Sequence, residues 1–338
     1  MQNILVIRND KLGDFMLAWP AISLLKLQYP ESKITALVPS YTKPIAECCP
    51  WIDNILVDKK TGAIELAGQI KTGRYDASVS LYSELRTSMA LWLARVPVRS
   101  GPATKIAQIF LNRRLRQRRS LSLKPEYEYN IDLSRFLIEQ NGDTPVNPAT
   151  PPYLEFSPNE TTTLKKKTIG EFGIKGNPKL VFIHPGSGGS AVNLSLEQFA
   201  QLADYIARKM TVYFVITAGP DELETATNLA SRLHQHTRSV YHSLEGLVQF
   251  ARFISICDLF ISGSTGPLHI AGALNVPTAA FYPARRSATS LRWTTLNEAG
   301  KKISFSPETY NKSSRTLDID IDGCADEITD FLRKTDDI

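Results

Sequence analysis

The sequence contains no long apolar run and only four cysteines. No stretch approaches the roughly 20 apolar residues that cross a membrane, and the start lacks the basic, apolar and small-residue order of a secretory signal. Cys48 and Cys49 are adjacent, whereas Cys257 and Cys324 stand alone, so no metal-ligand spacing is present. We therefore expect a cytoplasmic protein whose thiols are free and buried.

Glycine-rich nucleotide fingerprints are also missing. No G-x-G-x-x-G motif follows either leading strand, which disfavours an NAD-dependent oxidoreductase. The glycine-rich stretch HPGSGGSAVN, residues 184–193, lacks the Gly-Lys-Ser/Thr ending of a nucleoside-triphosphate loop.

Strand-like and helix-like segments alternate in both halves of the 338-residue chain, which is long enough for two domains. Strands are predicted at 3–7, 33–39, 54–58, 75–81, 179–186, 212–219, 257–263 and 278–282, with helices near 63–72, 84–94, 128–142, 196–209, 221–234 and 267–274. A proline-rich connection over 143–160 separates the two series. The pattern predicts an α/β protein of two doubly wound Rossmann-like domains facing a cleft. We place the domains at 1–155 and 156–325, followed by a C-terminal helix over 326–338 that packs back on the first domain.

Residues 261–283 are the most informative stretch of the second half, because they predict a strand, a tight turn, a short helix and another strand. Pro267 suits the first turn of the helix, and Ser264 or Thr265 can cap it. The free amides at this helix start offer a seat for a diphosphate. His269, one turn further on, either adds a donor or is a satisfied core histidine.

Two other turns follow predicted strands. Gly186, Ser187, Gly188 and Gly189 form a second candidate phosphate cradle, although glycine-rich turns are common in α/β proteins. Glu222 lies at the start of a helix just past a strand, where its carboxylate either caps the helix or accepts hydrogen bonds from a nucleoside.

A run of arginines occupies residues 112–120, NRRLRQRRS, with five arginines in seven consecutive positions. The run is either a solvated helix face or a docking surface for the phosphates of nucleic acid, an anionic membrane or a phosphorylated glycolipid. No aromatic residue is interleaved, which disfavours stacking on single-stranded nucleic acid.

The order of four motifs resembles glycosyltransferase family 9, which contains the ADP-heptose:lipopolysaccharide heptosyltransferases. The motifs are RNDKLGDFMLAWPA at the start, HPGSGG opening the second domain, GPDE after the next strand and STGPLHIAGALNVPT near the end. The resemblance covers nearly the whole chain. It implies a fold of the glycosyltransferase B type, no metal or other cofactor, and inversion at the anomeric carbon of a nucleotide-activated sugar, with ADP-heptose as the expected donor.

The resemblance also implies roles for individual residues. Asp14 of the Gly-Asp pair is the candidate catalytic base, with an N-cap of the helix from Phe15 as the structural alternative. A helix start favours the anion, so we expect lowered basicity at Asp14. Gly13 lets the acceptor approach the backbone, while the amides of Thr265, Gly266 and the 186–189 turn meet the diphosphate.

The acceptor of the family is the anionic inner core of lipopolysaccharide at the inner leaflet of the cytoplasmic membrane. We therefore expect acceptor contacts from Lys11, Arg113, Arg114 and Arg116, with Arg118 and Arg119 as further members of the arginine run. We also expect a monomer that touches the inner membrane peripherally and binds no nucleic acid.

The sequence departs from the family pattern at two places. Val192 to Leu194 replace a Lys-Arg-Trp-like run, and Ser264 replaces an aspartate found in some members. The cations that can compensate are Arg8, Lys11, Arg285 and Arg286. A nucleotide-sugar epimerase or hydrolase, and a non-catalytic protein that binds a sugar nucleotide or glycan, remain open alternatives.

Overall fold

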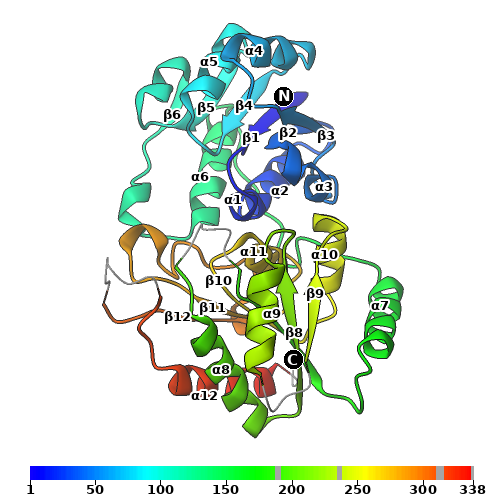
Figure 1. Cartoon of the computed structure of the whole chain (residues 1–338). Helices are drawn as coiled ribbons and strands as arrows, with labels where there is room; N and C mark the ends of the chain where they lie inside the picture. Colours follow the sequence, from blue (N-terminus) through cyan, green and yellow to red (C-terminus); the bar gives the residue numbers. More distant parts are fainter. Residues whose placement is uncertain (187–191, 234–237, 310–315, 336–338) are drawn as a thin grey trace. The chain divides into compact units, whose positions relative to one another are not determined.

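The computed structural model describes residues 1–186, 192–233, 238–309 and 316–335, and it divides into two compact units, Met1–Tyr153 and Leu154–Ile338 (Figure 1). Each unit contains a six-stranded sheet in which every pair of neighbouring strands is parallel. Each helix among the described residues is too short or too polar to traverse a bilayer.

The sheet of the N-terminal unit has the strand order β3-β2-β1-β4-β5-β6. Its strands are β1 (Asn3–Ile7), β2 (Lys33–Pro39), β3 (Asn54–Asp58), β4 (Ala77–Ser80), β5 (Val98–Pro102) and β6 (Arg113–Leu115). The order reverses between β1 and β4, and in open parallel sheets ligands bind at the carboxyl ends of strands beside such a reversal. The residues that follow β1 and β4 therefore occupy the expected position for a site.

Helices cover both faces of this sheet. They are α1 (Leu12–Met16), α2 (Trp19–Gln28), α3 (Lys43–Ala46), α4 (Ala63–Thr72), α5 (Leu85–Leu93) and α6 (Glu126–Glu139), with short 3₁₀ turns η1 (Ser40–Thr42), η2 (Ile106–Phe110) and η3 (Arg119–Leu121). Leu5 and Ile7 of β1 share one buried cluster with residues of α4 and α5. Right-handed crossovers on the two sides of the reversal place α2 on the other face, where it packs against α6.

The C-terminal unit repeats this architecture, with the strand order β12-β11-β10-β7-β8-β9. Its strands are β7 (Lys179–His184), β8 (Val212–Ala218), β9 (Arg238–His242), β10 (Leu259–Gly263), β11 (Thr278–Phe281) and β12 (Lys302–Phe305). Its helices are α7 (Pro158–Glu171), α8 (Leu196–Lys209), α9 (Leu223–Arg232), α10 (Leu247–Ile254), α11 (Gly266–Ala273) and α12 (Ile321–Lys334), with 3₁₀ turns η4 (Arg286–Ala288) and η5 (Ala299–Lys301).

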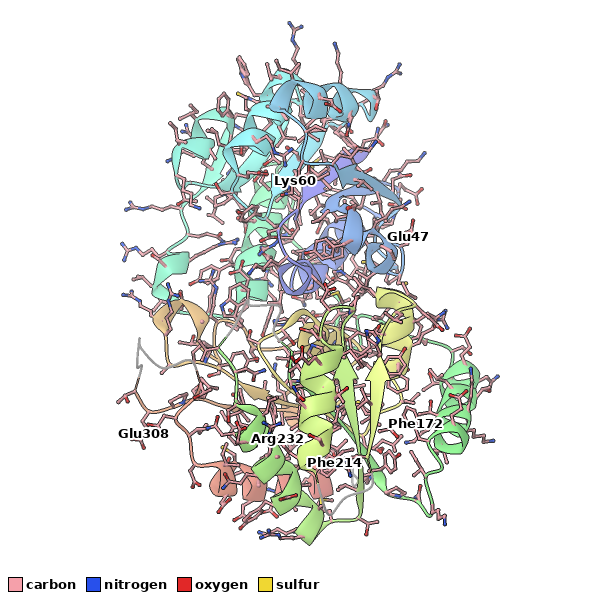
Figure 2. The ribbon with its side chains drawn as sticks, in the orientation of Figure 1. Glu47, Lys60, Phe172, Phe214, Arg232 and Glu308 are labelled. Carbon is pink, nitrogen blue, oxygen red and sulfur yellow. The ribbon has the colours of Figure 1, made fainter. Side chains whose placement is uncertain are left out.

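Apolar strands and amphipathic helices form the core of this unit. Phe214 of β8 is fully buried between the sheet and its helices (Figure 2). A capping box starts α8, since Ser195 Oγ accepts from the Gln198 amide while Gln198 Oε1 accepts from the Ser195 amide. The helix is therefore fixed at its first turn.

The C-terminal helix corrects one expectation. It begins at Ile321, earlier than the predicted 326, because the Asp320 side chain caps it by accepting from the Gly323 amide. Ile328 and Leu332 lie in the core of the C-terminal unit, where α12 packs against α8. These apolar residues of α12 are thus buried within the C-terminal unit, and the expectation that the helix packs on the N-terminal domain stays a prediction.

Several short elements were absent from the prediction. The strands β5, β6, β9 and β12 were not expected, because VRSGP and RRL, for example, lack an apolar run. The expected connection over 143–160 ends at α7, which begins at Pro158. The arginine run is not a helix face, since Arg113 and Arg114 lie in the edge strand β6.

Candidate active site

A buried arginine organises the carboxyl end of β1. Arg8 Nη2 donates to Asp14 Oδ1, Nε donates to Asp10 Oδ1 at 2.9 Å, and Nη1 donates to Glu126 Oε1 at 3.1 Å. Arg8 is 2% exposed and also donates to Asn130 Oδ1 at 3.1 Å. One guanidinium thus joins three carboxylates from the β1–α1 loop, α1 and α6, so that Asp14 has a fixed cationic neighbour.

Asp14 lies in the first turn of α1, and its pKa departs from the ordinary value of an aspartate. Burial raises its pKa to about 6, Arg8 lowers it, and the neighbouring Asp10 and Glu126 raise it. The expected loss of basicity at a helix start is therefore wrong, because burial outweighs the field of a one-turn helix. The N-cap alternative is also wrong, since Lys11 occupies that position and Asp14 bonds to Arg8.

A second polar network borders the same sheet edge and was missed from the sequence. Asn9 Nδ2 donates to Asp58 Oδ2 at 2.6 Å and to Glu84 Oε2 at 3.1 Å, and Arg86 Nη2 lies 2.6 Å from Asp58 Oδ2. Burial alone would raise the pKa of Asp58, but hydrogen bonds from Arg86, Asn9 and Lys60, which is labelled in Figure 2, hold it at about 2. A usable signal was present, because Asn9, Asp58 and Glu84 all stand at or just after strand ends.

In the C-terminal unit the turn after β10 is held by hydroxyl groups. Thr265 is the N-cap of α11, its Oγ1 accepts from the Leu268 amide at 3.5 Å, and it lies 3.0 Å from Ser262 Oγ. Thr265 is therefore the cap, whereas Ser264 is half-buried without that role. The helix begins at Gly266, whose amide belongs to the free first turn.

His269 lies on α11 and is only 3% exposed. Burial lowers its pKa to about 4, so the imidazole is neutral at physiological pH. Its Nδ1 has no hydrogen-bond partner among the residues that the structure describes. His269 is therefore not a core histidine with all of its hydrogen-bonding groups paired. A buried ring nitrogen without a partner is costly and needs an explanation.

Glu222 and Gly186 lie against each other. Glu222 Oε2 accepts from the Gly219 amide at 3.0 Å and lies 3.4 Å from His184 Nε2, and burial lowers the pKa of that histidine. A Cβ on Gly186 would come within 2.2 Å of the Glu222 carboxyl carbon. Glu222 occupies the N-cap position of α9 without a side-chain bond to the helix, so the capping alternative is wrong. Ser187, Gly188 and Gly189 lie outside the described residues.

Residues 192–194, where the sequence departs from the family pattern, include side chains that pack into the core of the C-terminal unit. Val192 contacts the core, and Leu194 is buried. The Asn193 side chain lies against Gly263, because a Cβ added at Gly263 would be only 2.6 Å from Asn193 Oδ1. Of the candidate compensating cations, Arg8 is committed to its three carboxylates, whereas Lys11, Arg285 and Arg286 are exposed.

The arginine run divides into two parts. Arg119 Nη1 donates to Glu126 Oε1 at 2.8 Å, so Arg119 belongs to the Asp14 network and does not extend the docking surface. The exposed Arg116 and Arg118 line a pocket of about 380 Å³ together with Lys124, Tyr129 and Arg135. Arg113 and Arg114 are exposed on β6 and do not line this pocket.

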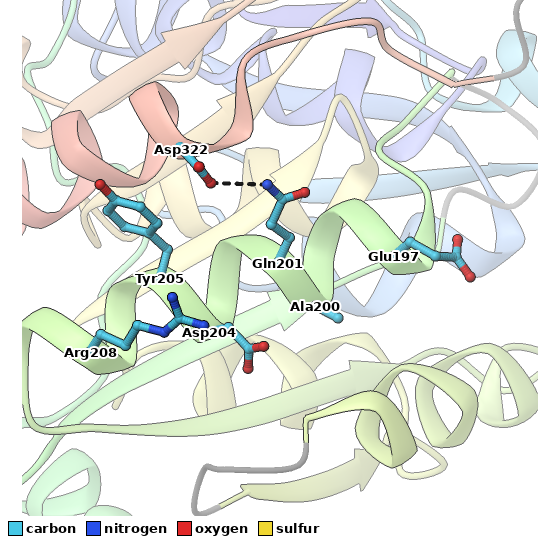
Figure 3. A pocket seen from close by; sticks show the side chains of 7 residues that line it. All are labelled: Glu197, Ala200, Gln201, Asp204, Tyr205, Arg208 and Asp322. Carbon is cyan, nitrogen blue, oxygen red and sulfur yellow. Dashed lines mark hydrogen bonds between the residues drawn. The ribbon is translucent and has the colours of Figure 1, made fainter.

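A further pocket of about 420 Å³ lies on α8 and α12 (Figure 3). Gln201 Nε2 donates to Asp322 Oδ1 at 2.9 Å across it. No predicted site residue lines this pocket. Within the described part of the chain, no group of three His, Cys, Asp or Glu side chains is arranged to hold a metal ion.

Comparison with known proteins places this geometry in context. The model of glycosyltransferase family 9 (heptosyltransferase) matches residues 63–316. A Haemophilus influenzae protein, named provisionally as a glycosyltransferase, is 43% identical over 338 residues, which cover 98% of this chain and 97% of the relative. Lipopolysaccharide heptosyltransferase 2 of Escherichia coli is 23% identical over 291 residues, 82% of each chain.

Solved structures share the fold. A family 9 glycosyl transferase from Veillonella parvula has a TM-score of 0.80 and 20% identity, with 98% of this chain and 97% of that chain covered. The ADP-heptose lipopolysaccharide heptosyltransferase II of Escherichia coli has a TM-score of 0.77 and 19% identity, with 99% and 100% covered. The predicted α/β fold of two doubly wound Rossmann-like domains of the glycosyltransferase B type is confirmed.

Proposed function

Because the chain belongs to glycosyltransferase family 9, we propose that it transfers a heptose or a related sugar from a nucleoside-diphosphate donor, ADP-heptose, to a lipopolysaccharide inner-core or related glycan acceptor. The proposed reaction inverts the anomeric carbon and uses no metal. The observation that carries the proposal is a half-buried carboxylate, Asp14, held by a buried arginine at the end of β1.

Asp14 is proposed as the general base. The acceptor hydroxyl must lose a proton as it attacks the anomeric carbon, which has oxocarbenium character in the transition state. A pKa of about 6 leaves the carboxylate mostly ionised at neutral pH, yet more basic than an ordinary aspartate. Arg8 is proposed as a positioning residue, since it fixes Asp14 Oδ1 and leaves the other carboxylate oxygen for the acceptor.

The donor is proposed to bind the C-terminal unit. The leaving diphosphate gains negative charge, which the backbone amides of Thr265, Gly266 and residues 186–189 would stabilise together with the Ser264 hydroxyl. The neutral His269 would add a hydrogen bond, in keeping with its unpartnered Nδ1. Glu222, beside Gly186, would accept hydrogen bonds from the nucleoside.

The acceptor is proposed to bind the N-terminal unit. Lys11 and Gly13 stand on either side of Leu12 at the start of α1, next to Asp14. Arg116, which lines a pocket with three further cations and the carboxylates of Asp132 and Glu139, would bind an anionic group of the glycan, with Arg113 and Arg114 as further contacts. We also propose that the enzyme is a monomer working at the cytoplasmic face of the inner membrane, where such a glycolipid acceptor is presented.

Acceptor-dependent release of ADP tests the proposal. Purified protein is incubated with ADP-heptose, with and without a heptose-free lipopolysaccharide core, and ADP is measured together with the mass of the core. Release that requires the core and adds one heptose to it supports transfer. Release without the core would instead assign a hydrolase or epimerase. Absence of turnover with this and other sugar nucleotides would leave a binding protein.

A further inference from the structure

The charges of the N-terminal unit are strongly segregated along the chain. Residues 85–125 contain ten arginines and lysines and no aspartate or glutamate, although the net charge of the whole chain is only +5. The rest of the chain therefore carries a net negative charge. Such a segment has a positive potential that its own sequence does not neutralise.

Exposed apolar side chains lie within the same segment. Ile106 and Ile109 of η2 are 64% and 62% exposed, and residues three apart in a 3₁₀ helix share one face. Trp92 and Leu93 of α5 are 51% and 39% exposed, and the Trp92 ring lies 5.8 Å from that of Phe110 at the end of η2. This contact joins α5 and η2, so the exposed apolar groups come from neighbouring elements.

Cations border these apolar groups. Arg95 follows α5, and Lys105 immediately precedes η2, and both are exposed. Neither has an ion-pair partner among the residues that the structure describes. Arg113 and Arg114, at the edge of the sheet after η2, add two more exposed cations.

We propose that these residues form a surface that binds an anionic lipid bilayer. The basic apolar face, defined as Trp92, Leu93, Arg95, Lys105, Ile106 and Ile109, would insert its apolar groups at the interface while its cations meet lipid phosphates. Binding at a membrane interface strengthens with the buried apolar area and with the attraction of cations to anionic lipids, and this surface offers both. Nucleic acid would use the cations but would leave the exposed isoleucines without a partner.

The same segment reaches the proposed catalytic network. Arg119, which lies within it, shares the Glu126 carboxylate with Arg8, the partner of Asp14. A bilayer bound to the basic apolar face would therefore lie on the unit that contains Asp14. The idea that this surface brings Asp14 to an acceptor in the membrane rests on the proposed function, whereas the binding of the surface to a bilayer does not.

Vesicle co-sedimentation tests the surface without donor or acceptor. The full chain is mixed with phosphatidylcholine vesicles, with and without phosphatidylglycerol, at physiological salt. The test variant is Lys105→Gln/Ile106→Ser, and the matched control is Lys33→Gln/Leu27→Ser, which changes an exposed lysine and an exposed leucine outside the segment. All four side chains are exposed, so both variants are expected to fold, as checked by thermal unfolding.

We expect the wild type and the control to bind vesicles that contain phosphatidylglycerol, and the test variant to bind roughly tenfold more weakly. Equal binding of the two variants would refute this surface. Failure of the wild type to bind vesicles would refute membrane docking. If the wild type bound duplex DNA but not vesicles, the basic segment would instead be a nucleic-acid-binding surface. None of these outcomes depends on ADP release, so glycosyl transfer is tested separately.

Discussion

Replacing Asp14 by asparagine is expected to abolish proton removal while preserving the shape of the site. The amide oxygen of asparagine can still accept from Arg8, which keeps Asp10 and Glu126 as partners. A positioned general base contributes roughly 10²–10⁴-fold to a rate. We therefore expect kcat to fall by about that factor, with little change in the KM for the donor, because Asp14 belongs to the other unit.

The pH dependence follows from the raised pKa of Asp14, which lies at about 6. The base is active when ionised, so kcat/KM of the wild type should rise with pH below 6 and level off above it. Ionisation of Asp14 favours activity but lowers the stability of the fold. The folded state holds the Asp14 proton more tightly than the unfolded chain, so the carboxylate destabilises the fold increasingly as pH rises from about 4 to 6. Asp14→Asn should therefore raise the free energy of unfolding at pH 8, by at most about 3 kcal/mol.

The assay measures ADP release across pH 4.5–8.5 for both proteins, and urea unfolding at pH 8 in parallel. A variant that is inactive and at least as stable as the wild type identifies a functional carboxylate. Near-wild-type activity in Asp14→Asn, with the acid limb of the pH profile unchanged, would show that another group removes the proton.

Three further predictions concern other contacts. Arg8→Met leaves three carboxylates without their shared cation and should destabilise the fold by about 3–5 kcal/mol, seen as a lower Tm; an unchanged Tm would contradict the burial of this network. Gly263→Ala places a Cβ 2.6 Å from Asn193 Oδ1 and should cost about 1–3 kcal/mol, and a double mutant with Asn193→Ala should cost less than the sum of the two single changes. Arg116→Gln should raise the KM for the acceptor roughly tenfold and leave the KM for the donor unchanged, and equal KM values for the acceptor would remove Arg116 from the site.

The regular elements were accessible to sequence reasoning because their signals are local. The apolar runs at 3–7, 33–39 and 54–58 coincide with β1, β2 and β3, and the helix predicted near 196–209 is α8. Buried parallel strands are apolar on both faces, so even a short window detects them. Edge strands such as β6 carry polar side chains and have no such pattern.

Contacts between residues far apart in the chain could not be predicted from local sequence patterns. Glu126 is separated from Arg8 by 118 positions, and its proximity depends on α6 packing against α2. Nothing local in NRRLRQRRS distinguishes Arg119, which is paired with Glu126, from Arg116, which lines a pocket.

The sequence by itself determined the alternation of strands and helices, the family motifs and the candidate base, because each depends on a few neighbouring residues. The tertiary structure decided the state of those residues. Burial of Asp14 beside Arg8 raised its basicity, and burial of His269 made it neutral. A pKa reflects the solvent and charge that surround a group on all sides, and those surroundings come from segments far apart in the chain.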